Sequence, residues 1–198
     1  MLPPHRDNCV TAVTPLSCAR ATIAGLPVAP PLLAGAYGGD EAGLICGYLF
    51  DDSAAEAVRA FDSAAAAAWL DGNGLQAHGA NAYLWLHFNL SHTQAERWLL
   101  RHAGLSDTFY ESLRDGLHST RIERADDALV AVINDLHFDF RFEPSDISTL
   151  WINVGPRLVV TARTKPLRSV DALRTAVRAG DAPRSSTELL EHLLRTQA

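Results

Sequence analysis

The sequence predicts an α/β domain in which helices cover both faces of a mixed, centrally antiparallel sheet, giving α/β/α layering. Short runs of apolar and β-branched residues alternate with amphipathic segments that begin at Ser or Asp and end at Gly. Later runs follow one another across short turns, as in antiparallel hairpins. The helices between the earlier strands indicate parallel or mixed neighbours at the sheet edges.

The chain begins with residues 1–40, which are rich in Pro, Ala, Gly and Thr and show no periodicity. We therefore expect a poorly ordered N-terminal tail before a domain over residues 41–198. Residues 21–39 carry no charge. Their prolines and glycines would leave backbone groups unpaired in lipid, so we interpret this stretch as a linker and expect no membrane span.

Period-2 patterns and turn residues locate the strands. We expect them, in chain order, at residues 44–50, 83–90, 121–123, 128–134, 147–154 and 157–163. Asp126 and Asp127 are interpreted as turn residues between two of these strands, and Gly155-Pro156 as the turn of a hairpin. Residues 138–142 are a further candidate for extending the strand over 128–134.

Capping residues locate the helices. Asp51–Ser53 is expected to cap a helix that continues to residue 70 and ends at Asp71–Gly74. Ser91 with Gln94, and Ser185 with Glu188, fit the capping box. The remaining expected helices span residues 93–102, 107–115, 170–178 and 185–195. The last helix runs to Ala198 without a Gly or Pro stop signal, so we interpret the chain as a piece of a longer protein.

Composition narrows the class of function. Seventeen Lys and Arg against 23 Asp and Glu give a net charge of −6, which argues against a nucleic-acid partner. Cys9, Cys18 and Cys46 form no Cys-x-x-Cys pair and no secretory signal is present, so a reducing compartment is favoured. No nucleophile elbow, phosphate loop, zinc-protease or dinucleotide motif occurs. We therefore expect no enzyme activity and no cofactor.

One group of side chains is a candidate metal site. Asp135, His137 and Asp139 alternate and would share one face of an extended segment. Two carboxylates and an imidazole can hold a divalent ion such as Zn²⁺, although a polar outer strand face explains the same pattern. Glu111 and His118 are lower-ranked candidates.

Other conspicuous residues have plainer interpretations. His87 could bind a metal, but a core histidine with satisfied hydrogen bonds is favoured. Trp85, Trp98 and Trp151 stand among apolar residues and are expected in the core. A basic series surrounds a predicted strand–helix junction without a Gly-rich loop, so a solvated face is favoured over a phosphate site. This series consists of Arg157, Arg163, Lys165 and Arg168.

Three stretches of the sequence together carry a resemblance to a known family. They are, in chain order, Leu84–His92 with Trp98–Leu105, Glu111–Glu123, and Ile147–Val154 with Leu158–Leu167. They resemble, in the same order, a WxHxDL strand with its helix, an E-D-x-L to R-P-K-V-E segment, and a long hairpin ending in R-x-P-L. These are motifs of the cytoplasmic N-terminal domain of CorA-type divalent cation transporters, and the resemblance is greatest to the ZntB-like zinc branch. Ser112 stands where magnesium-type members have an Asp that helps to bind a regulatory ion, which favours the zinc branch.

The resemblance implies a cytoplasmic funnel domain with a regulatory and assembly role in a homopentameric membrane transporter. Zn²⁺, more than Mg²⁺, would be the transported or regulatory ion. A stalk helix and membrane spans would follow Ala198, so the full-length protein would lie at the cytoplasmic face of the inner membrane and this fragment would be soluble. A free-standing soluble metal-sensing or metal-binding module with the same fold is the alternative.

Overall fold

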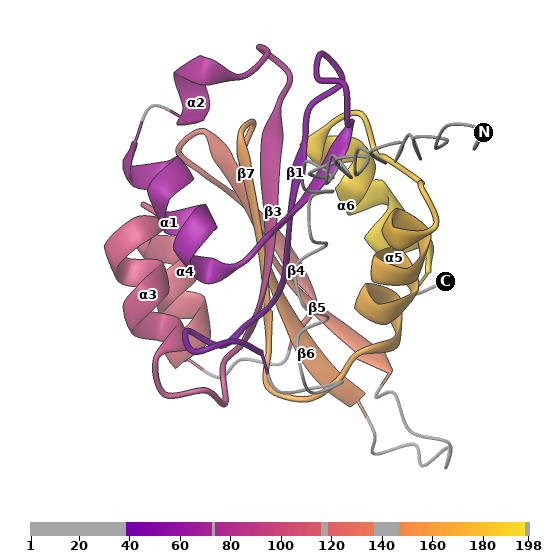
Figure 1. Cartoon of the computed structure of the whole chain (residues 1–198). Coiled ribbons are helices and arrows are strands. Elements are labelled where there is room, and N and C mark those ends of the chain that lie inside the picture. Colours follow the sequence, from indigo (N-terminus) through magenta and orange to yellow (C-terminus); the bar gives the residue numbers. More distant parts are fainter. Residues whose placement is uncertain (1–38, 73, 116–118, 137–146, 197–198) are drawn as a thin grey trace, which may run out of the picture.

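A single mixed sheet with helices on both faces forms the domain (Figure 1). The structure, a computed structural model, describes residues 39–72, 74–115, 119–136 and 147–196. The strands are β1 Leu44–Phe50, β2 Val58–Phe61, β3 Tyr83–Asn89, β4 Arg121–Ala125, β5 Ala128–Leu136, β6 Ile147–Val154 and β7 Leu158–Arg163. The helices are α1 Ser63–Asp71, α2 Gly74–Ala77, α3 Ala95–His102, α4 Asp107–Arg114, α5 Arg168–Arg178 and α6 Ser186–Arg195.

The seven strands lie in the order β2-β1-β3-β7-β6-β5-β4. Every neighbouring pair is antiparallel except β3 and β7, which are parallel. The mixed sheet and the layering of the predicted fold are confirmed. The parallel pair, however, lies inside the sheet, whereas parallel or mixed neighbours were expected at its edges.

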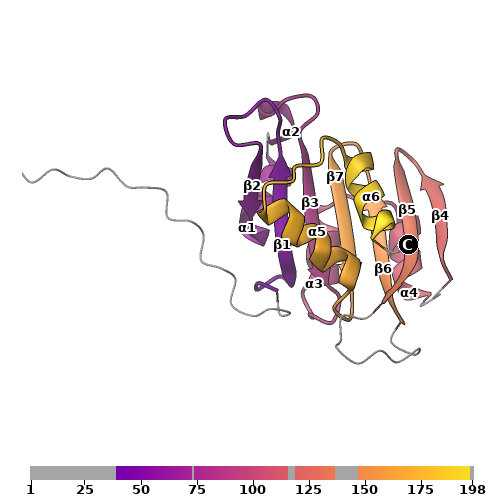
Figure 2. The same cartoon turned by 90° about the vertical axis from the view of Figure 1, so that its right-hand side faces the viewer.

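Two apolar clusters, one on each face, hold the layers together. The helices α1 to α4 lie on one face of the sheet, and α5 and α6 lie on the other (Figures 1 and 2). Leu84, Leu86 and Phe88 of β3 point into the first cluster, and Tyr83 and Trp85 point into the second. This alternation is the period-2 pattern of a strand buried on both faces. The expected core positions of Trp85 and Trp151 are confirmed, and Trp98 packs against the first cluster partly buried.

The segment after β1 differs from the prediction. No helix starts at Asp51; residues 58–61 instead form the edge strand β2, which pairs with β1. The Asp51 carboxylate accepts hydrogen bonds from Ser53 within a turn, and Asp62 is the residue that caps α1, by accepting a bond from Ala65 N. A short aspartate turn and a helix N-cap use the same side-chain chemistry, so the sequence alone does not separate them.

Two other helix boundaries also differ. Ser91 does not cap α3, which begins at Ala95; its hydroxyl donates to the Thr164 carbonyl instead. A short helix, α2, starts at Gly74, where only a stop was expected. The predicted end near Gly104 is correct, because Gly104 has the positive φ of 56° that follows many helices.

The predictions for the second half are mostly confirmed. Asp126 takes a φ of 52° in the turn between β4 and β5, and Gly155-Pro156 lies between β6 and β7. Ser185 caps α6 by accepting from Glu188 N, and the Glu188 carboxylate accepts from Arg184 N. Residues 138–142 lie outside the described part of the chain, as does the predicted tail up to residue 38.

Asp40 belongs to the folded domain although the prediction placed it in the tail. One oxygen of its carboxylate accepts from Ala42 N and Leu44 N, and the other accepts from Ser63 N. These bonds join the start of β1 to the first turn of α1.

Candidate functional site

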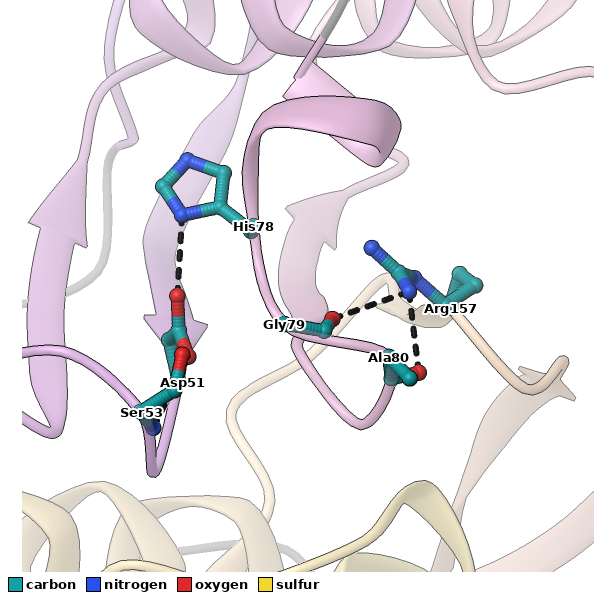
Figure 3. Close-up of polar contacts among 6 residues, drawn as sticks. All are labelled: Asp51, Ser53, His78, Gly79, Ala80 and Arg157. Carbon is teal, nitrogen blue, oxygen red and sulfur yellow. Dashed lines mark hydrogen bonds and ion pairs between the residues drawn. The ribbon is translucent and has the colours of Figure 1, made fainter.

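Three loops meet at the end of the sheet where β1 ends and β3 and β7 begin (Figure 3). Asp51 follows β1 directly, and its Oδ1 accepts hydrogen bonds from the backbone N–H and the hydroxyl of Ser53. Its Oδ2 lies 2.9 Å from Nδ1 of His78, in the segment before β3. We call Asp51, Ser53, His78 and Arg157 the loop junction.

The Asp51 carboxylate is charged. Its exposed fraction is 5%, yet the hydrogen bonds from Ser53, with His78 adding to them, lower its pKa from 3.8 to about 2. An ionised carboxylate only accepts hydrogen bonds, so Nδ1 of His78 carries the proton between them. Both oxygens of Asp51 already accept hydrogen bonds from within the domain.

Arg157 joins the third loop, the β6–β7 turn, to the same junction. One terminal nitrogen of its guanidinium, Nη1, donates to the carbonyls of Gly79 and Ala80, at 3.0 and 2.9 Å. The Arg157 carbonyl in turn accepts from Leu84 N in β3. A Cβ at Gly79 would lie 2.8 Å from Oγ of Ser53, so a side chain here would require the Ser53 side chain to shift. The junction thus fixes the β6–β7 turn to the segment before β3.

The bonding at the junction does not suit nucleophilic catalysis. The Ser53 hydroxyl donates to Asp51, whereas a nucleophilic serine must donate its proton to a base such as histidine. The arrangement is that of a turn fixed by an aspartate. Ser-His-Asp proximity here is therefore structural.

A row of buried polar side chains lies on the face of the sheet that α5 and α6 cover, close to α5. Oγ1 of Thr161 is 2.9 Å from both Nε1 of Trp85, which donates to it, and Nδ1 of His87. His87 is 1% exposed, and burial, with Arg163 and Arg174 nearby, lowers its pKa well below 6.5. The interpretation of His87 as a core histidine with a hydrogen-bond partner is confirmed.

Cys46 lies beside His87 in the neighbouring strand β1. Burial raises the pKa of the Cys46 thiol to about 12, so the thiol stays protonated at neutral pH. A protonated thiol is a poor metal ligand and a poor nucleophile.

An open hollow of about 860 Å³ lies at the same end of the sheet as the loop junction. Its walls come from the β4–β5 turn, the β6–β7 turn and the first turn of α6, and Ala80 belongs to both the hollow and the junction. The charged side chains that line it are Arg124, Asp127 and Arg184. Charges of both signs line the hollow, so it offers no strong preference for an anion or a cation.

The structure does not test the predicted metal ligands as a group. Asp135 lies in β5, where its backbone is paired opposite Ser148, while His137, Asp139 and His118 lie outside the described residues. Glu111 is exposed on α4. Among the described residues no group of three or more His, Cys, Asp or Glu side chains is placed to hold a metal ion.

Ser112 points into the core. It is fully buried, its hydroxyl donates to the Phe109 carbonyl, and its own carbonyl accepts from Nε1 of Trp151. The hydroxyl of Ser112 is therefore bound inside the domain and does not reach the surface of α4.

The basic series is only partly a solvated face. Lys165 and Arg168 are exposed, as expected, but Arg163 is 2% exposed and Arg157 is half-buried in the loop junction. The expectation is therefore wrong for Arg163 and Arg157. An arginine next to a Gly-Pro turn is a weak signal of such a role, because the five N–H donors of its guanidinium can bind nearby backbone carbonyls.

Comparison with known proteins now places the chain. A family model described as "CorA-like Mg2+ transporter protein" matches residues 80–197, which is more than half of the sequence. The chain belongs to this CorA-like family. The match starts just before β3 and includes the parallel β3–β7 pair, the β4–β7 hairpins and helices α3 to α6.

Relatives of this CorA-like chain agree with the family. The divalent cation transporter CmaX of Pseudomonas aeruginosa is 27% identical over 111 residues, covering 56% of this chain and 33% of CmaX. The solved full-length CmaX superposes with a TM-score of 0.64 at 25% identity, covering 80% of this chain and 46% of the CmaX chain. The chain thus spans about a third to a half of the length of these relatives.

Two further solved structures share the fold. The ZntB cytoplasmic domain of Vibrio parahaemolyticus has a TM-score of 0.58 at 15% identity, covering 78% of this chain and 57% of that chain. The CorA magnesium transporter of Methanocaldococcus jannaschii has a TM-score of 0.53 at 17% identity, covering 77% and 44%. In the described part of the CorA-like chain no helix is long and apolar enough to cross a membrane.

Proposed function

We propose that this CorA-like chain is the cytoplasmic regulatory and assembly domain of a membrane transporter for divalent metal ions. The observation that carries the proposal is the family match over residues 80–197. The likeness to CmaX at 25% identity supports it over most of the described fold. The domain is proposed to have no enzyme activity of its own, which agrees with the bonding of Ser53 to Asp51.

Zinc is proposed as the ion in preference to magnesium. In the magnesium-type members that the sequence resembles, an Asp next to the Glu of α4 helps to bind a regulatory ion. The matching Ser112 carries no charge, and its hydroxyl is bound inside the domain. This supports the absence of that magnesium site, while Asp135, His137 and Asp139 are kept as the proposed zinc ligands.

The proposed partners are further copies of the same chain, in a homopentamer. The membrane spans would follow the described domain and place it at the cytoplasmic face of the inner membrane. The sequence of the encoding gene beyond the codon for Ala198 tests this arrangement. We expect the codons after Ala198 to encode a long helix and two hydrophobic stretches of about 20 residues. A stop codon close to this position would instead favour a free-standing metal-binding module.

Calorimetric titration of the domain tests the ion. We expect weak Zn²⁺ binding and weaker Mg²⁺ binding, with the Zn²⁺ heat lost in an Asp135→Asn, His137→Ala, Asp139→Asn variant. A His192→Ala variant is the control, because His192 lies on α6 and not in the proposed site. Submicromolar Zn²⁺ affinity that survives His137→Ala would show that the site is elsewhere.

A further inference from the structure

Among the described strands, the sheet ends at β4. In the sheet order β4 is the last strand, and β5 is its one partner within the described residues. Figure 2 shows no other described element beyond it on that side. The outward backbone N–H and C=O groups of such an edge can pair with a further strand.

Apolar side chains gather at this edge. Only three large apolar side chains of the described residues are strongly exposed, and two of them, Ile122 at 53% and Leu129 at 37%, lie here. Ile122 is opposite Ala131, and Arg124 is opposite Leu129. Ala131 points into the cluster beneath α5 and α6, so Ile122 and Leu129 are diagonal neighbours on that same face. They form a short apolar strip at the margin of the sheet.

The two charged residues on the other face of β4 would each face a residue of opposite charge in a second, antiparallel β4 strand. Arg121 and Glu123 point away from Ile122, and Nε of Arg121 lies 3.2 Å from Oε1 of Glu123. If two β4 strands pair antiparallel with Ile122 opposite Ile122 of the second copy, each Arg121 faces a Glu123. Opposite charges directly across two strands stabilise the pairing.

Neighbouring registers lack this match. A shift that centres the pairing on Glu123 brings two carboxylates together. A shift that centres it between Ile122 and Glu123 brings Arg121 opposite Arg124. Like charges directly opposite are destabilising, so the Ile122-centred register is favoured over both of these.

We propose that a second copy of this chain is the partner of the β4 edge, with the two β4 strands antiparallel and centred on Ile122. The apolar strip then continues through both copies as Leu129, Ile122 and the partner's equivalents. Such a two-fold contact closes on itself and leaves other surfaces free for further assembly. It is separate from the contacts of the proposed homopentamer, because a two-fold contact cannot join the five copies of one five-fold ring to one another. An edge this short gives a weak dimer, which forms at high protein concentration.

Sedimentation velocity over a wide concentration range tests the pairing. The wild-type chain should shift reversibly from monomer to dimer. Glu123→Arg and Arg121→Glu should each weaken association by about tenfold or more, because each places like charges across the two-fold axis. A wild-type chain that stays monomeric at every concentration would overturn the proposal.

Mixing the two variants gives the sharpest readout. Each alone is repulsive, but the Glu123→Arg chain carries only positive and the Arg121→Glu chain only negative charge at these positions, so the mixture should dimerise. Arg59→Glu on the opposite edge strand β2 and Glu56→Arg in the β1–β2 loop are controls with the same charge changes. If the controls weaken association equally, net charge and not β4 is responsible.

Cross-linking tests the register independently of affinity. In a Cys9→Ser, Cys18→Ser background, Ile122→Cys should give a covalent dimer under mild oxidation, since the two positions face each other across the axis. Arg124→Cys, which faces Thr120 of the second copy in this register, should cross-link far less. Equal yields from the two variants would overturn the register, and no dimer from Ile122→Cys would overturn the pairing.

Discussion

Removing the Asp51 carboxylate should destabilise the domain, because this side chain holds the loop junction together. Asp51→Ala leaves the Ser53 N–H and hydroxyl and Nδ1 of His78 without their acceptor. Hydrogen bonds to a charged group contribute about 1.5–3 kcal/mol each, but Ser53 is exposed and His78 is half-buried, so water replaces part of what is lost. We expect the free energy of unfolding to fall by about 2–4 kcal/mol.

Urea unfolding followed by tryptophan fluorescence measures this change. Asp52→Ala is the matched control, since Asp52 is the exposed neighbour with the same charge. It should change stability by less than about 0.5 kcal/mol. If Asp51→Ala costs no more than Asp52→Ala, the loop junction does not stabilise the domain.

The pH dependence provides a second check on Asp51. Its pKa is lowered from 3.8 to about 2, so its contribution is complete above about 3.8 and is lost as the pH falls towards 2. The stability difference between wild type and Asp51→Ala should therefore shrink over that range. A difference that stays constant down to pH 2 would mean that the charged carboxylate is not what matters.

Three further predictions concern other parts of the domain. Burial lowers the pKa of His87 in the fold well below 6.5, its ordinary value in the unfolded chain. The free energy of unfolding should therefore fall below pH 6.5, by up to about 1.4 kcal/mol per pH unit from this group. The urea midpoint of His87→Gln should fall less steeply with decreasing pH than that of the wild type. Gly79→Ala should cost about 1–3 kcal/mol in the same assay, because the new Cβ meets Ser53; a neutral effect would show that the loop has room. In a Cys9→Ser, Cys18→Ser background, Cys46 should react with a thiol reagent only after urea is added, and rapid reaction of the native protein would contradict its burial.

Local patterns were sufficient to predict the hairpins of the second half. Alternating apolar residues on either side of Gly155-Pro156 define β6 and β7, and the acidic pair Asp126-Asp127 marks the turn before β5. These signals act over a few residues, and no competing structure uses them in the same way. The caps of α6 were predictable for the same reason.

Local patterns failed where one residue type serves two structures. Asp51 and Ser53 suit a helix cap and an aspartate turn equally, so β2 was missed. The parallel pairing of β3 with β7 depends on residues that lie far apart in the sequence, such as Leu84 opposite Leu158. No local period encodes that choice.

The loop junction was beyond sequence reasoning because its contacts join distant residues. Asp51 and His78 are 27 positions apart, and Arg157 reaches Gly79 across 78. Each residue alone is an ordinary turn residue. The predicted ligands Asp135, His137 and Asp139, by contrast, lie close together in the sequence. Their grouping into a metal site remains a prediction.

Measuring ion flux through the full-length gene product tests whether the protein transports divalent cations. The protein would be reconstituted in vesicles that enclose a Zn²⁺-sensitive or a Mg²⁺-sensitive dye, with protein-free vesicles as the control. We expect divalent cation entry that depends on the protein and is faster for Zn²⁺ than for Mg²⁺. Entry of Mg²⁺ alone would contradict the proposed ion, and no protein-dependent entry of any divalent cation would contradict the transporter assignment itself.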